Sequence, residues 1–210
     1  MKHCFCRRTP RIAAVAARRF AYSLVELILV MALISIIIGL SFPLMNTITR
    51  GNSLVRAGQM VGDHLALARQ EAVGRNRPVQ VRFVQFGSGS ASFRGIQLWA
   101  PSVDNITTFA PISRLAILPD GVVLARNAAL SPMLTDAPVV GKSEVFPGLG
   151  SVTYSAFRFR PGGGTDLTFA SLSNFVTLVY TKDETVATPP ANYFAVQVDP
   201  VNGRTRLFQP

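Results

Sequence analysis

A single carboxylate, Glu26, lies at the start of a long uncharged apolar stretch, and its position is the clearest chemical signal in the sequence. The 19 residues from Leu27 to Met45 carry no charge, and as a helix they would be about 28 Å long, close to the hydrocarbon thickness of a bilayer. A carboxylate at the membrane edge of such a helix costs a few kcal/mol unless it is paired. Glu26 therefore predicts an ion pair with a cationic group.

Two arginines near the C-terminus, Arg204 and Arg206, form a second group that could bind a ligand. We expect a last strand over residues 204–208, in which residues two apart point to the same face. Two guanidinium groups on one face could meet successive phosphates of a nucleic acid. Two arginines supply little of the several-phosphate contact that useful affinity for DNA requires. DNA binding is therefore the weaker hypothesis for this pair.

Residues with the spacing of a catalytic or metal site do not stand out. Beyond Ala21 the chain has one histidine, His64, and no cysteine, and it shows no Ser-His-Asp order, HExxH or paired-carboxylate motif. We interpret His64, on an amphipathic helix, as a surface or packing residue. The glycine run in 161–165 lacks the lysine and spacing of a P-loop and is interpreted as a flexible turn. We expect no enzyme activity, no cofactor and no metal site.

The segment before the apolar stretch is basic, with six positive residues and no acid: Lys2, Arg7, Arg8, Arg11, Arg18 and Arg19. Such a segment should stay in the cytoplasm and send the C-terminal bulk outward. Removing residues 1–21 leaves 15 basic residues against 11 acidic ones, so the formal charge falls from +10 to +4. Both cysteines, Cys4 and Cys6, lie in this segment. A chain cleaved after it could form neither a disulfide nor a cysteine metal site.

The residues around Glu26 resemble the type IV prepilin signal, which is a small residue followed by an aromatic, Ser or Thr, Leu, any residue and Glu. Ala21 matches the residue before the cut, Tyr22 the new N-terminus, and Ser23, Leu24 and Glu26 the remainder. The resemblance implies that a membrane prepilin peptidase cleaves after Ala21 and that Tyr22 is N-methylated. It also implies that Glu26 pairs with the N-terminal amine of a neighbouring subunit. Ala21 stands where Gly is usual, and Tyr22 where Phe or Met is usual.

Two simpler interpretations of the N-terminus were weighed. A plain signal anchor explains the apolar length but not Glu26, nor the basic leader that ends at a small residue. A removed secretory signal has an apolar region of about 7–15 residues followed by an A-x-A-like site, whereas this run is longer and no such site follows. Pro43, twenty-one residues after Tyr22, falls where pilin helices carry a kinking proline.

After Met45 the pattern becomes amphipathic, with apolar residues at spacings of three and four: Leu54, Ala57, Val61, Leu65, Ala68 and Ala72. We expect one helix from about Ser23 to Val73, ended by Gly74 and Pro78. The stretch 66–83 resembles the helix end and first strand of pseudopilins of the GspH/FimT type, with matches at Arg69, Glu71, Ala72, Arg75, Pro78 and Val79. The turn 75–77 is interpreted as a solvated basic cap.

The remaining chain predicts a β-rich domain, with strands expected near residues 79–83, 93–99, 114–118, 122–124, from 154, 175–180, 193–198 and 204–208. Gln80 and Arg82 alternate with apolar residues, the pattern of a half-buried strand, and Arg158 and Arg160 are expected to face water. Residues 100–111 read as a loop. Residues 127–150 have no clear period and are interpreted as a long surface excursion.

We therefore expect an α+β, pilin-like fold: a cleaved cytoplasmic leader (1–21), a long helix (22–74) that spans the membrane over about 24–45, and an antiparallel β-rich domain (75–210). The resemblance implies a structural minor pseudopilin of a type II secretion or type IV pilus-like filament. It would be anchored by a single pass in the bacterial inner membrane, with a periplasmic domain, before it enters the filament.

Its implied partners are other pseudopilins, the prepilin peptidase and the inner-membrane assembly platform. The alternative is a FimT-like minor pilin that binds DNA for uptake, through a G-R-x-R motif at 203–206. The stretches AGQMVGDHLALARQEAVGRNRPVQVRF and FRGIQLW also resemble the prepilin-like proteins called Verru_Chthon cassette protein D.

Overall fold

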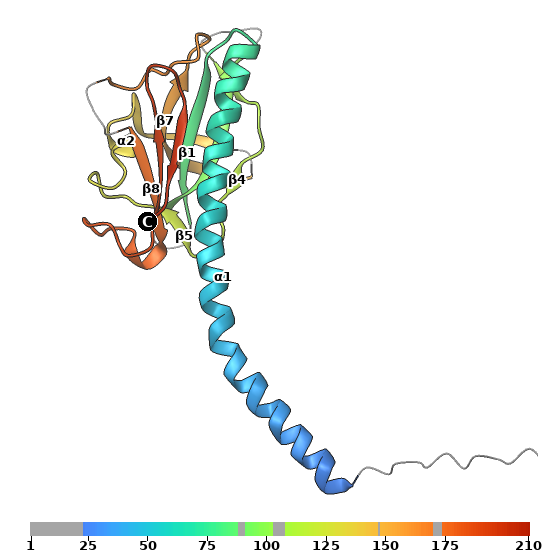
Figure 1. Ribbon diagram of the computed structural model, residues 1–210. Coiled ribbons are helices and arrows are strands. Elements are labelled where there is room, and N and C mark those ends of the chain that lie inside the picture. Colours follow the sequence, from blue (N-terminus) through green and yellow to red (C-terminus); the bar gives the residue numbers. More distant parts are fainter. Residues whose placement is uncertain (1–22, 88–90, 103–107, 147, 170–173) are drawn as a thin grey trace, which may run out of the picture. The chain divides into compact units, whose positions relative to one another are not determined.

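The computed structural model describes residues 23–87, 91–102, 108–146, 148–169 and 174–210, without the side chains of residues 40–51. Its elements follow in chain order (Figure 1): α1 (Leu24–Gly74), β1 (Val79–Phe86), β2 (Ser92–Pro101), β3 (Phe109–Pro111), β4 (Ala116–Ile117), β5 (Val122–Leu124), α2 (Pro132–Thr135), β6 (Val139–Phe146), β7 (Gly150–Phe159), β8 (Phe175–Tyr180), the 3-10 turn η1 (Thr181–Asp183), β9 (Phe194–Val198) and β10 (Thr205–Phe208).

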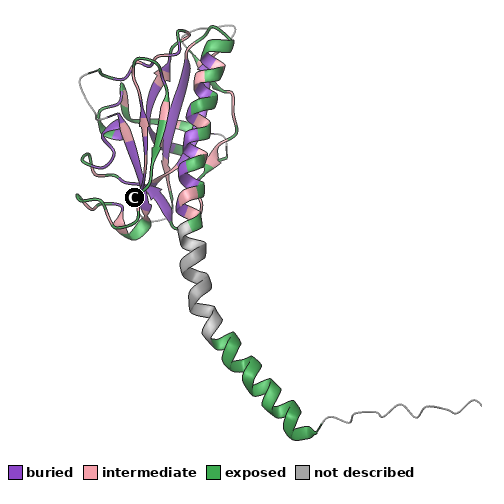
Figure 2. Cartoon of the chain, viewed as in Figure 1, coloured by how far each residue is buried: buried purple, intermediate pink, exposed green. Residues whose placement is uncertain are grey.

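The chain divides into two compact units, residues 1–45 and 46–210, and α1 contributes to both. In the first unit every described side chain is exposed, as the green part of the helix in Figure 2 shows. The second unit holds the whole sheet and the part of α1 that carries buried residues. The expected α+β architecture, a long helix followed by an antiparallel β-rich domain, is confirmed.

Within the described residues, ten strands form one antiparallel sheet in the order β10-β9-β8-β5-β2-β1-β7-β6, and β3 and β4 both pair with β2. The interpretation of residues 127–150 as a surface excursion is wrong, because they contain α2 and the edge strand β6. The sequence pattern did not predict β6, because nearly all residues of this strand are at least partly exposed and apolar and polar residues do not alternate along it. β3, within the expected loop 100–111, is also a short strand.

One face of the sheet packs against the second half of α1. The six helix positions predicted to be apolar and inward-facing are all buried: Leu54, Ala57, Val61, Leu65, Ala68 and Ala72. They join one core cluster with residues from β1, β2, β5, β7, β8 and β9, among them Phe83, Phe157 and Phe159. The apolar residues that recur every three or four positions along the helix thus pack against those that alternate along the strands, and together they form one apolar layer.

Two glycines shape the helix where it meets β9 and β10. A Cβ at Gly58 would lie 2.2 Å from the Phe194 ring, and one at Gly62 would lie 3.0 Å from Leu207. Their spacing of four residues places both on one side of the helix. The glycines cost the helix intrinsic stability, about 1 kcal/mol each relative to alanine. Close packing against the Phe194 ring therefore requires glycine at position 58, whereas a side chain at position 62 would only have to displace the end of the exposed Leu207 side chain.

The helix ends in a hydrogen-bonded turn built on Asn76. This residue has φ +50°, the left-handed conformation that Asn tolerates better than most residues. The Arg77 N–H donates to Ala72 O and the Asn76 N–H donates to Val73 O, which together make a Schellman motif. Arg75 pairs with Glu71 at 2.5 Å. The predicted end of the helix is confirmed, with Asn76 as the left-handed residue.

The opposite face of the sheet carries a second core, and the sheet must curl to close it. The Trp99 and Phe146 ring centroids lie 5.2 Å apart, although β2 and β6 are separated by β1 and β7 in the sheet. Three strand spacings in a flat sheet amount to about 14 Å. The β6 edge therefore folds toward β2, and Val84, Val152, Tyr154 and Ala156 are buried between them.

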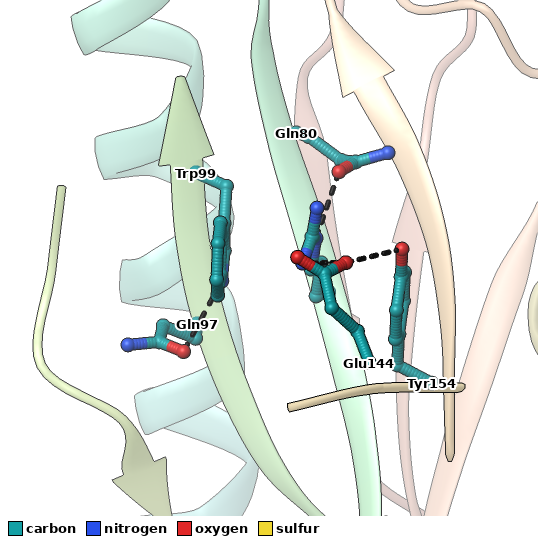
Figure 3. Close-up of polar contacts among 6 residues, drawn as sticks. Gln80, Gln97, Trp99, Glu144 and Tyr154 are labelled. Carbon is teal, nitrogen blue, oxygen red and sulfur yellow. Dashed lines mark hydrogen bonds and ion pairs between the residues drawn. The ribbon is translucent and has the colours of Figure 1, made fainter. Parts of the chain in front are cut away.

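A buried arginine lies at the centre of this second core, and Figure 3 labels four of the residues around it, Gln80, Trp99, Glu144 and Tyr154. Arg82 is 3% exposed, and its guanidinium carbon lies 3.8 Å from the Trp99 ring centroid and 4.4 Å from that of Tyr154. Its Nε donates to Gln80 Oε1 and its Nη1 to Glu144 Oε2, each at 2.8 Å. The Tyr154 hydroxyl donates to the same Glu144 oxygen at 3.1 Å. Arg82 is thus held between two rings and neutralised by one carboxylate.

The prediction of a half-buried strand at this position is wrong, because Gln80 and Arg82 are also buried, under the curled β6 edge. Desolvation lowers the pKa of Arg82, while Tyr154 and Glu144 act in the opposite direction. Burial likewise raises the pKa of the Tyr154 phenol, against the effect of the nearby guanidinium. A buried cation is tolerable only with such partners, so this cluster ties β1, β2, β6 and β7 together.

The contact between Gly58 and Phe194 can be tested directly. We expect Gly58→Ala to lower the free energy of unfolding by about 1–3 kcal/mol, because overpacking outweighs the gain in helix propensity. Chemical denaturation of the full-length chain measures the change. Gly74→Ala is the matched control: nothing lies within 4 Å of its Cβ position, so no loss is expected. Equal stability of Gly58→Ala and wild type would show that the helix does not sit this close to β9.

The Arg82 cluster makes a second prediction. We expect Glu144→Ala to lower the free energy of unfolding by about 2–3 kcal/mol, because a buried cation loses its carboxylate. The double variant Arg82→Met with Glu144→Gln removes the stranded charge and should cost less than Glu144→Ala alone. Asp120→Ala, which breaks the surface pair with Arg94, is the control and should have almost no effect. A double variant less stable than Glu144→Ala would contradict this account.

Candidate functional site

The start of α1 places Glu26 in the first helical turn. Ser23 caps the helix: its Oγ accepts a hydrogen bond from the Val25 N–H at 3.3 Å, and its carbonyl accepts from the Glu26 N–H at 3.0 Å. A carboxylate here interacts favourably with the helix dipole, by about 0.3–1 kcal/mol when exposed. Glu26 therefore has one local role, as an acid at a helix N-terminus, and its side chain is exposed.

The other N-terminal predictions fall outside the described residues. Ala21 and Tyr22, the expected cleavage and methylation positions, are among residues 1–22, and the side chain of Pro43 is among those at 40–51. Among the described residues, no helix has an apolar stretch of the length that crossing a membrane requires. Cleavage, the kink and the membrane span remain predictions from the sequence.

The C-terminal hairpin between β9 and β10 holds the second predicted group. Asp199 organises its turn: one carboxylate oxygen accepts from the Val201 N–H at 2.9 Å, and the other accepts from the Asn202 amide at 2.7 Å. The Gly203 N–H donates to the Asp199 carbonyl, and the Arg204 N–H donates to Asn202 Oδ1, each at 2.8 Å. The carboxylate of Asp199 is therefore engaged by its own turn.

The hairpin is fixed to the helix and to the turn after β7. Gly203 has φ +66°, and a Cβ there would lie 2.1 Å from the Gly163 carbonyl oxygen. The Arg69 Nε donates to the Asn202 carbonyl at 2.8 Å. The glycine run at 161–165 is thus a turn against which the hairpin packs, in agreement with its interpretation from the sequence.

A half-buried acid, Asp166, completes the support of this end of the domain. The Arg158 N–H donates to its Oδ1 at 2.6 Å. Burial raises the pKa of Asp166, and the Arg158 N–H together with the charges of Arg158 and Arg160 opposes that rise. Arg158 is half-buried, and its guanidinium carbon lies 4.9 Å from the Phe109 ring centroid. Arg160 is exposed. The expectation that both arginines face water holds for Arg160 alone.

Arg204 and Arg206 are both exposed, but they differ in their backbone setting. β10 begins at Thr205, one residue later than predicted, so Arg204 precedes the strand and Arg206 lies opposite Gln197. Leu207 contacts the Gly62 side of α1, so the alternation of a strand places Arg206 on the other face. No ion pair of either arginine occurs among the described residues.

The predicted residues are divided between the two units of the chain. Glu26 belongs to the first unit and the two arginines to the second. His64 lies on α1 with its Nδ1 2.8 Å from the Met60 carbonyl oxygen, half-buried. Within the described residues, no group of three or more His, Cys, Asp or Glu side chains is placed to hold a metal ion. The polar cluster around Arg82 was missed because its acid, Glu144, lies 62 residues away in a strand that the pattern did not reveal.

Comparison with known proteins supplies the family. The family model described as Type II transport protein GspH matches residues 59–200. A solved structure of the minor pseudopilin EpsH from the Type 2 Secretion System of Vibrio cholerae is 13% identical, covers 75% of this chain and 98% of that chain, and has a TM-score of 0.43. The type IV minor pilin FimU of Pseudomonas aeruginosa is 15% identical, covers 77% of this chain and 96% of that chain, and also has a TM-score of 0.43. No curated protein sequence matches the chain.

The matched region runs from the middle of α1 to the turn after β9, and so includes nearly all of the second unit. It also contains the whole stretch 66–83, which carries the resemblance to GspH/FimT-type proteins. Since the family model covers more than half of the sequence, the chain belongs to the GspH family of type II transport proteins.

Proposed function

We propose that this chain is a minor pseudopilin, a structural subunit of a type II secretion or type IV pilus-like filament. The observation that carries the proposal is the match of residues 59–200 to the GspH family. The sequence adds an N-terminal segment of the prepilin type, with a basic leader, an apolar helix and Glu26. In this proposal a prepilin peptidase removes residues 1–21, and the helix anchors the chain in the inner membrane until assembly.

The exposed apolar surface of α1 supports the proposal. Twelve large apolar side chains between Leu24 and Ile38 are 45–74% exposed. Burying them fully would stabilise an assembly by on the order of 20 kcal/mol, at about 1.5–3 kcal/mol for each side chain. A contiguous apolar surface of this length requires a lipid or protein partner. In the proposal it is covered by lipid before assembly and by the helices of other subunits afterwards.

Glu26 then acts as the charged partner of a neighbouring subunit's N-terminal amine. Cleavage after Ala21 would create that amine at Tyr22, four residues from Glu26, at the same end of the helix. Within an apolar bundle the pairing would offset the cost of burying the carboxylate, and only one axial offset between helices allows it. The pair would therefore set the register of the filament.

A second candidate function is DNA binding during uptake. The observation in its favour is that Arg204 and Arg206 are exposed and have no acidic partner among the described residues. We expect weak, salt-dependent binding of duplex DNA if this function holds, and loss of binding in the variant Arg204→Ala/Arg206→Ala. Fluorescence anisotropy at two salt concentrations measures both. Binding that is absent, or unaffected by salt, removes this candidate.

The filament proposal is tested at the N-terminus. In cells that contain a prepilin peptidase, mass spectrometry should find a chain that begins at N-methylated Tyr22. Glu26→Ala should reduce incorporation into sheared filaments at least about tenfold, the equivalent of 1.4 kcal/mol per subunit, because the amine loses its partner. Asp63→Ala, which removes an exposed acid from the second half of α1, is the matched control and should assemble normally. A chain that still begins at Met1 in such cells would contradict the proposal.

A further inference from the structure

β10 forms one edge of the sheet, and nothing in the described chain covers its outer side. It pairs only with β9, and residues 206–210 are all exposed. Leu207 and Phe208, two large apolar side chains of this edge strand, are 46% and 49% exposed. An uncovered edge with exposed apolar side chains is a template for pairing with another strand.

The hydrogen bonds of the hairpin show which backbone groups of β10 point outward. The Arg204 carbonyl accepts from the Asp199 N–H at 2.9 Å, so it points to β9. The Val198 N–H donates instead to Asn174, so the Val198–Thr205 pair is a non-hydrogen-bonded one. In an antiparallel ladder the two kinds of pair alternate. The N–H and C=O groups of Thr205 and Leu207 therefore point away from the sheet.

The side chains of the same strand present two different faces. Leu207 points toward α1, where it contacts the Gly62 position. Arg206 and Phe208 lie on the opposite face, by the alternation of the strand, and Arg204, which directly precedes the strand, is also exposed. A strand added to this edge would thus have one side beside an apolar side chain and the other beside two guanidinium groups.

The hairpin that carries the two arginines has no carboxylate that is free to pair with them. The only carboxylate of the hairpin is that of Asp199, and it accepts hydrogen bonds from Val201 and Asn202. Among the described residues neither arginine forms an ion pair. Cations along an edge repel basic strands and discourage indiscriminate pairing, while they attract an acidic partner. The positive charge of this edge therefore favours pairing with an acidic strand over pairing with a basic one.

We propose that the β10 edge binds an extended segment of another protein chain in which acidic and apolar side chains alternate. The segment adds a strand to the sheet through the outward backbone groups of Thr205 and Leu207. Its carboxylates meet Arg204 and Arg206, and its apolar side chains lie beside Leu207. This surface belongs to the folded second unit and does not depend on the proposed role of Glu26.

The experiment uses the full-length chain in detergent micelles and a fluorescent octapeptide in which valine alternates with glutamate. Fluorescence anisotropy should show saturable binding that weakens as salt rises. Leu207→Pro should weaken binding at least about tenfold, because it removes an outward N–H. The fold should survive, since proline is tolerated where the N–H faces solvent on an edge strand. Leu207→Ala keeps the N–H and loses only the side-chain contact, so it should weaken binding by about threefold, clearly less than proline does.

Charge reversal tests the second element of the proposal. Arg204→Glu/Arg206→Glu should weaken binding at least about tenfold. Arg56→Glu/Arg114→Glu makes the same change in net charge at two other exposed arginines and should leave binding nearly unchanged. Hydrogen exchange adds a readout that is independent of mutation: bound peptide should protect the amides of Thr205 and Leu207 and leave that of Arg206, already bonded to β9, unchanged.

Three outcomes would overturn the proposal. The first is wild-type affinity in Leu207→Pro, and the second is equal binding of a peptide with lysine in place of glutamate. The third is displacement of the peptide by single-stranded DNA at lower concentration than by unlabelled peptide, which would assign the arginines to nucleic acid. Should Leu207→Pro prove unstable, the amide-protection pattern decides alone: no protection at 205 and 207 refutes strand addition. None of these results bears on N-terminal processing.

Discussion

Close approach between α1 and the sheet is the constraint on which the domain depends. The helix side of the contact is built from small residues, with Ala57, Ala68 and Ala72 fully buried and Gly58 beneath the Phe194 ring. The sheet side supplies large aromatic rings, among them Phe83, Phe157 and Phe159. Small residues on one element allow large ones on the other to interdigitate at interior packing density. This complementarity places glycine in the middle of a helix that would be more stable alone with alanine.

The opposite face of the sheet follows from the same need to bury apolar surface, with a different solution. Here there is no long helix, and the β6 edge curls so that Phe146 reaches Trp99. Arg82, between Trp99 and Tyr154, fills the interior of the curl with a planar cation that stacks on rings and binds a carboxylate. A charge in this position gives the curl a definite geometry, because the guanidinium is satisfied only when Glu144 of β6 is in place.

The sequence predicted those parts of the fold that depend on local periodicity. The buried stripe of α1 and its end near Gly74 required only residues three or four apart, and most strands showed alternation. β6 was not predicted because its side chains are largely exposed. The burial of Arg82 was not predicted because it depends on Glu144, which lies 62 residues away in that strand. The resemblance to a G-R-x-R motif pointed to Arg204 and Arg206, but that they have no acidic partner among the described residues is known only from the structure, in which the turn engages Asp199. The residue pattern of a single sequence does not show which distant segments contact each other in the fold.

The two units of the chain solve opposite problems, and this division explains how one protein could serve in an assembly. The second unit buries apolar residues of its own on both faces of the sheet. The described part of the first unit buries none of its large apolar side chains. Burial of such a surface is non-directional and large, so it supplies energy of association without choosing a partner. Choice must then come from directed interactions, for which we propose Glu26 and the charged β10 edge, where hydrogen-bond geometry and the sign of charge discriminate.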